Sequence, residues 1–201
     1  MPPNFIKNYL DKIKNINIAL SVLFFISIIA GYALAENNPE KVEKIFIENL
    51  KDMLEPALKL PSLKLFEFIF LKNLATAIIA VLSGIIFGII PILIIFINGL
   101  ILGIVSFIFL REFGAIALLS GLAPHGIFEI PALIFSAASG VWLWRSIYRR
   151  IIYEEKTLAS EFKLIIKFFI FAIIPLLFFA ALIESFATPA ILSTVKSFFN
   201  H

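Results

Sequence analysis

Four long stretches of this 201-residue chain contain almost no charge, and they constrain its fold more than any other feature. A helix needs roughly 20 apolar residues to cross about 30 Å of hydrocarbon. Each stretch is long enough for one such helix, and the second is long enough for two, so we predict about five transmembrane spans. In chain order the stretches are 15–35, 73–110, 113–144 (interrupted by His125 and Glu129) and 168–195 (interrupted by Glu184).

The composition points the same way, because apolar residues make up 61% of the chain and charged residues only 15%. A soluble domain of this size could not hide so much apolar side chain in its own core. We therefore predict an all-α, polytopic integral membrane bundle formed by one domain, 1–201, surrounded by membrane lipid. The net charge of +3 does not indicate a nucleic-acid partner, because the basic residues flank the apolar stretches instead of forming a patch with stacking aromatics.

The segments between the spans give the predicted organisation. Residues 15–35 are longer than the apolar core of a cleaved signal, so we expect a retained first span. After Asn38-Pro39, apolar residues recur at helical spacing, which indicates an amphipathic helix on the membrane surface or against the bundle, or else a solvated linker helix. The predicted segments are a basic lead (1–14), span 1 (17–35), the amphipathic segment (36–65), span 2 (66–88), span 3 (91–110), a re-entrant segment (113–124), span 4 (125–144), a basic loop (145–167), span 5 (168–186) and a tail (187–201).

The basic residues predict the orientation. Arg145, Arg149 and Arg150 lie directly at the end of span 4, and Lys/Arg-rich loops stay on the cytoplasmic side. We therefore expect a plasma-membrane protein with its N-terminus inside and, after five spans, its C-terminus outside.

A few polar residues interrupt the spans, and they form the candidate site. Charged side chains cost a few kcal/mol in lipid, so they usually face the interior of a bundle. Glu129 precedes Arg145 by 16 residues and Glu184 follows Lys167 by 17, which places both carboxylates about 25 Å from the basic ends at 1.5 Å per residue. His125 lies one turn from Glu129 on the same helical face, so these three side chains are predicted to meet inside the bundle. The predicted intramembrane polar or ligand site comprises Asn73, Asn98, His125, Glu129 and Glu184.

Two prolines and a glycine around His125 predict a helix break at the start of span 4. Pro124 suits the first position of a helix, where its missing N–H is no loss. Pro131 leaves the carbonyl of Ile127 without its helical donor. A break at Pro124, Gly126 and Pro131 would expose backbone donors and an acceptor beside an imidazole and a carboxylate, which is typical of binding sites in transporters.

Several roles are open for these polar residues: joining helices, binding a ligand, lipid or ion, recognising a partner, or holding a metal for hydrolysis. The metal role is disfavoured because the other histidine is His201 and there is no His-Glu-x-x-His pattern. Ser120, Ser136 and Ser185 lack the context of a nucleophile elbow. We expect no catalytic residue, no metal and no cofactor.

Two stripes of small residues lie on the predicted spans, Gly84/Gly88 on span 2 and Gly99/Gly103 on span 3. Such stripes let helices approach closely. Packing within the chain is favoured over a dimer face.

Short motifs between residues 66 and 189 bear on the family. They are Phe-Leu-Lys-Asn at 70–73, Asn-Gly at 98–99 with Gly103, Pro-His-Gly-Ile-Phe-Glu-Ile-Pro-Ala at 124–132 and Ala-Leu-Ile-Glu at 181–184. Together they resemble the stage II sporulation protein M family, the third motif being the most specific, although Ala123 stands where a leucine is expected. The resemblance implies an all-helical membrane protein with no known enzymatic activity. The founding member looks like a scaffold for peptidoglycan-degrading enzymes during engulfment, but relatives occur in organisms that make no spores.

From this resemblance we expect a non-enzymatic membrane scaffold or assembly protein. Its partners would be membrane lipid and either other proteins or a second copy of the chain. The alternative is a transporter of a small molecule, ion or lipid that uses the polar pocket.

Overall fold

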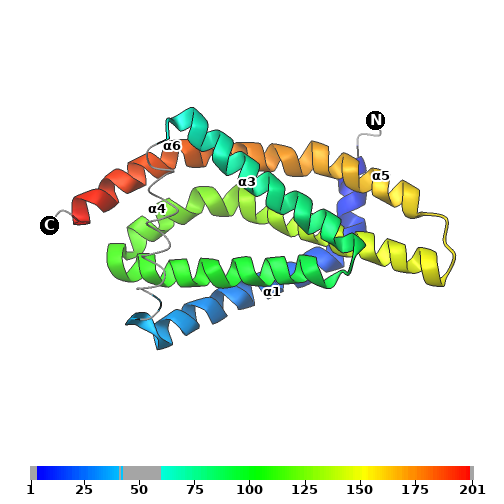
Figure 1. The fold of residues 1–201 in the computed structure, drawn as a ribbon, viewed down its shortest axis with the longest axis horizontal. Helices are drawn as coiled ribbons and strands as arrows, with labels where there is room; N and C mark the ends of the chain where they lie inside the picture. Colours follow the sequence, from blue (N-terminus) through cyan, green and yellow to red (C-terminus); the bar gives the residue numbers. More distant parts are fainter. Residues whose placement is uncertain (1–3, 41, 43–59, 200–201) are drawn as a thin grey trace.

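The structure is a computed structural model that describes residues 4–40, 42 and 60–199, with the side chains of 113, 116–117, 120–125 and 187–199 left out. All regular elements in this part of the chain are helical (Figure 1). Five helical stretches are long and apolar enough to cross a membrane: Phe5–Asn37, Ser62–Ile85, Ile89–Glu112, Gly126–Ile152 and Leu158–Phe186. The predicted all-α bundle of five membrane spans is therefore confirmed. The elements are α1 (Phe5–Asn37), α3 (Ser62–Leu82), the 3-10 turn η1 (Ser83–Ile85), α4 (Ile89–Ile152), α5 (Leu158–Phe168), the π-helical turn η2 (Phe169–Ile173) and α6 (Ile174–Phe199).

The helices extend further at the basic end than the sequence predicts. The predicted basic lead is mostly helical, because α1 already begins at Phe5 and buries Tyr9 and Ile13. The predicted basic loop is short, because α4 runs to Ile152 and α5 begins at Leu158. The predicted amphipathic helix falls on 41 and 43–59, which lie outside the described residues, and stays a prediction.

The direction of α4 reverses at Gly114, so that its two halves lie side by side (Figure 1). Gly114 has φ 79° and ψ 175°, a backbone conformation that is essentially restricted to glycine. The helix then continues through Pro124, Gly126 and Pro131, so the predicted break at these residues is wrong. A proline inside a membrane helix removes one backbone hydrogen bond, which neighbouring groups can compensate, whereas the reversal needs a conformation that other residues avoid. The predicted re-entrant segment is not confirmed either, because 115–124 is helical and continuous with the second half of α4.

Small residues bring the helices into backbone contact. A Cβ atom on Gly31 of α1 would clash with the backbone of Leu100, and one on Gly103 would clash with Ile28. Gly84, after α3, likewise touches the backbone of Gly140 in the second half of α4. Both predicted glycine stripes therefore pack within the chain, as such residues do in membrane helices.

The second half of α4 is the central helix of the bundle. Half of the residues in its most apolar stretch of 18 are buried inside the protein, against 22–33% of those in the corresponding stretches of the other four spans. Helices α3 and α6 pack against it and against each other. The wide turn η2 precedes Pro175, which cannot donate to the carbonyl of Phe171, and so lets the helix continue past the proline.

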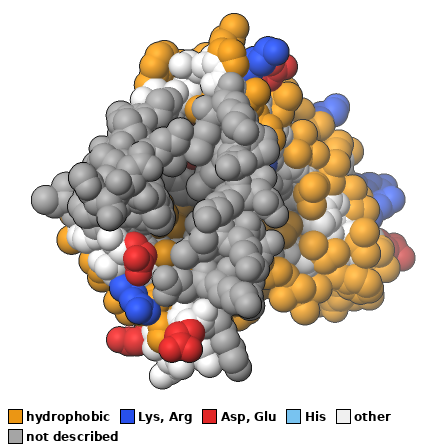
Figure 2. All heavy atoms as spheres, turned by 60° about the vertical axis from the view of Figure 1, so that its left-hand side comes forward, with side chains coloured by type: hydrophobic (Ala, Val, Ile, Leu, Met, Phe, Trp, Pro, Cys, Tyr) orange, Lys and Arg blue, Asp and Glu red, His pale blue; other side chains and the backbone are white. Residues whose placement is uncertain are grey.

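Apolar side chains cover much of the outer surface. Ile29 is 69% exposed, Phe25 63% and Phe87 57%. Figure 2 shows orange apolar side chains over the flank on the right of the view, with charged side chains at its margins. This is the surface expected of a bundle whose solvent is lipid.

Candidate functional site

The structure joins two of the predicted site residues directly. Asn73 of α3 donates from Nδ2 to Oε2 of Glu129 on α4, at 2.7 Å, and both side chains are partly buried. The two residues are 56 positions apart, so the hydrogen bond ties one membrane helix to another. An amide donor facing a carboxylate gives a charge-assisted contact in a region where each group would be costly against lipid.

Glu184 lies on α6, farther from the basic end than Glu129. The rings of Phe128 and Phe179 are 6.3 Å apart and fix the register between antiparallel α4 and α6. Glu184 is then displaced from the level of Glu129 by at least about six residues, or about 9 Å at 1.5 Å per residue. Its Oε2 atom is buried, and neither carboxylate is without a partner. The backbone of His125, one turn before Glu129, lies between these two levels.

The remaining predicted residues are placed differently. The side chain of His125 lies outside the described residues, so its meeting with Glu129 and Glu184 stays a prediction. Asn98 donates from Nδ2 to the carbonyl of Ile94 in its own helix, at 2.8 Å. Among the described residues, no group of three potential ligands for a metal is found.

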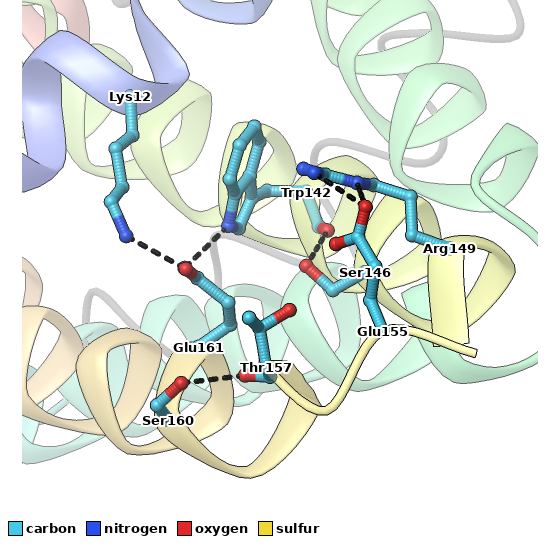
Figure 3. A network of polar contacts seen from close by, with 8 residues as sticks. All are labelled: Lys12, Trp142, Ser146, Arg149, Glu155, Thr157, Ser160 and Glu161. Carbon is cyan, nitrogen blue, oxygen red and sulfur yellow. Dashed lines mark hydrogen bonds and ion pairs between the residues drawn. The ribbon is translucent and has the colours of Figure 1, made fainter. Parts of the chain in front are cut away.

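A second polar cluster, which the sequence analysis missed, lies at the basic end (Figure 3). Lys12 of α1 donates to Oε1 of Glu161 at 2.7 Å, and the indole N–H of Trp142 donates to Oε2 of the same carboxylate at 2.9 Å. Glu161 of α5 thereby joins the N-terminal helix α1 to α4. Its side chain is 13% exposed and that of Lys12 is 39% exposed.

Buried contacts below this cluster strengthen the same junction. The hydroxyl of Tyr9 donates to Ser139 at 3.1 Å, and the ring of Tyr9 lies 4.7 Å from that of Phe168. One sequence signal could have revealed the helix that places Tyr9, since Ile6, Tyr9 and Ile13 recur at helical spacing. No local pattern relates Lys12 to Glu161, because that contact depends on the tertiary fold.

The fold and the site together define a class, the multi-pass helical membrane proteins. In this bundle the helices approach closely at glycines, and two of them are joined by a polar pair in the interior. The chain matches the family described as stage II sporulation protein M over residues 20–189, and it belongs to that family. The family resemblance inferred from the motifs is therefore confirmed.

One curated relative, an uncharacterized protein of Methanocaldococcus jannaschii, is 32% identical over 133 residues. The aligned region covers 64% of this chain and 58% of the relative, so this chain spans less than two thirds of that protein's length. No solved structure matches the chain.

Proposed function

We propose that this protein is a non-enzymatic membrane scaffold, a rigid bundle on which other membrane or envelope proteins assemble. The proposal rests on one observation: the intramembrane polar pair joins two helices of the bundle to each other. Asn73 and Glu129 hydrogen-bond to each other, and α3 and α4 also meet through the close approach of Gly84 to Gly140. Helices joined both by a hydrogen bond and by backbone contact favour a fixed platform over a body that rocks between two states.

A transporter is the second candidate, and one observation favours it. Two carboxylates, Glu129 and Glu184, are partly buried in a bundle with an apolar outer surface, and such acids often mark ion or substrate pathways. Flux of an ion or solute into proteoliposomes that depends on Glu129 would support this candidate against the scaffold.

We propose that the protein lies in the plasma membrane with its N-terminus in the cytoplasm. The support is the gathering of basic residues at one end of the bundle, where the start of α1 meets α4 and α5 through Lys12 and Glu161. The chain has no cysteine, so single cysteines report cleanly. An impermeant maleimide on intact cells should label Asn37→Cys and leave Ser160→Cys unlabelled; equal labelling at both would contradict the orientation.

The Glu129→Gln variant separates the two functional candidates. It keeps the shape and hydrogen-bonding capacity of the side chain and removes its charge. If the protein is a scaffold, the variant should melt near the parent and still cross-link to, and co-purify with, the same partners from native membranes. Glu67→Gln, the same change at an exposed position of α3, is the matched control.

Loss of a biological activity in Glu129→Gln, with folding and partners intact, would count for ligand handling and against the scaffold. Failure to recover any stable partner of the parent after cross-linking in native membranes would also count against it.

A further inference from the structure

A cavity opens at the basic end of the bundle, away from the polar pair. Its volume is about 660 Å³, within the range of small-molecule sites. Most of its lining is apolar and comes from the last turns of α4 and the first turns of α5, including Leu143, Ile147, Leu158 and Phe162. Two cations, Arg150 and Lys156, also line it.

The aromatic residues nearby place this cavity at the level of the membrane surface. Trp144 packs against Phe87 at 5.3 Å, and Tyr148 against Tyr153 at 6.3 Å. Tyr148 is 47% exposed and Tyr153 65%. Tryptophan and tyrosine are enriched where lipid headgroups meet hydrocarbon, so the cavity opens at headgroup depth.

Two cations at this end are paired with carboxylates of the chain, and neither of them lines the cavity. Arg149 is paired with Glu155 at 2.8 Å, and Lys12 is paired with Glu161 at 2.7 Å. Within the described part of the chain, neither Arg150 nor Lys156 forms an ion pair with a carboxylate, and Arg150 makes one long hydrogen bond, 3.4 Å, to the carbonyl of Glu154. The cavity thus combines an apolar floor with positive charge that the protein itself does not neutralise.

We propose that this cavity binds one anionic phospholipid of the surrounding leaflet. The headgroup phosphate would accept hydrogen bonds from Arg150 and Lys156, and part of a hydrocarbon chain would lie along Leu143, Ile147 and Phe162. Basic pockets at helix ends recognise anionic lipid headgroups in this way. A free phosphate would satisfy the cations but leave the apolar floor to water, so a lipid fits the whole cavity.

Native mass spectrometry of the protein in detergent, titrated with phosphatidylglycerol or phosphatidylcholine, tests the proposal. We expect one tightly bound phosphatidylglycerol and no equivalent phosphatidylcholine. Arg150→Gln and Lys156→Gln should each weaken that lipid by about five-fold, and the double variant by about thirty-fold. Lys163→Gln, an exposed cation of α5 that does not line the cavity, should bind as the parent does.

Two further arms identify the source of the phosphate and the role of the floor. Ala159→Trp, which fills the cavity without changing charge, should abolish the single binding event while melting as the parent does. Displacement of the lipid by an equal concentration of inorganic phosphate would mean a free-anion site and would overturn the lipid assignment. Undiminished binding in the double variant, or an equal loss in Lys163→Gln, would overturn it as well.

Discussion

Replacing Gly114 by alanine tests the reversal within α4. A Cβ atom at this position would meet nothing within 4 Å, so any cost comes from the backbone and not from a clash. A residue other than glycine at φ 79° and ψ 175° costs about 1–3 kcal/mol. The lower entropy of alanine in the unfolded chain offsets up to about 1 kcal/mol. The middles of these two ranges leave a net destabilisation of about 1 kcal/mol, which should lower Tm by about 2–4 °C for a chain of this length.

The matched control is Gly126→Ala, the same chemical change inside the helical part of α4. Its Cβ would lie 3.8 Å from the nearest atom, Cδ1 of Ile130, which is an ordinary contact. Because alanine is the better helix former, this variant should gain up to about 1 kcal/mol. Thermal unfolding in lipid nanodiscs, followed by circular dichroism, would compare the two. If Gly114→Ala melts at or above the parent, or if both variants lose stability equally, the reversal does not depend on glycine geometry.

Two more predictions concern the contacts that hold the bundle together. Gly31→Ala should lower the melting temperature through a loss of about 1–3 kcal/mol, because its Cβ would press on the backbone of Leu100 and separate α1 from α4; a parent-like melt would show that these helices do not need close contact. Glu161→Gln should cost no more than about 1 kcal/mol, since Lys12 is partly exposed, and the difference from the parent should shrink in high salt. A larger, salt-independent loss would mean that the carboxylate stabilises this junction by more than a screened surface ion pair, through the hydrogen bond that it accepts from Trp142.

The membrane spans could be predicted from the sequence because their signal is local. Length and apolar content decide whether a helix can cross a bilayer, and both can be read within one segment. The glycine stripes were equally readable, since Gly99 and Gly103 lie four residues apart on one helical face and α1 packs against them. The spans and the glycine contacts can both be predicted because each depends on residues that are close together in the sequence.

The reversal of α4 could not be predicted in the same way. Pro124, Gly126 and Pro131 form the strongest local signal for a break, yet the chain reverses at Gly114. Proline only weakens a helix, and a bundle can satisfy the carbonyl that loses its donor. The position of the reversal depends on how the two halves of α4 pack together, which no single segment encodes.

The level of Glu184 was misjudged for a related reason. Counting residues from Lys167 places Glu184 at the level of Glu129 only if Lys167 lies at the same level as Arg145. In the structure the next residue, Phe168, is fully buried and its ring lies 5.7 Å from that of Phe135, ten residues before Arg145. Lys167 therefore belongs to a level inside the span, and Glu184 lies correspondingly farther from the basic end. A lysine with a long apolar stem can leave its helix at that level and still reach water.

Other contacts hold the bundle together when the Asn73–Glu129 hydrogen bond is removed. α3 and α4 are held by the Asn73–Glu129 hydrogen bond and also by the close approach of Gly84 to Gly140. The basic end is held separately through Glu161. One interhelical hydrogen bond in a membrane averages about 0.6 kcal/mol, which is small beside the packing that would remain. A variant at Glu129 should therefore keep its fold, so any change in its partners or its activity reports on function and not on stability.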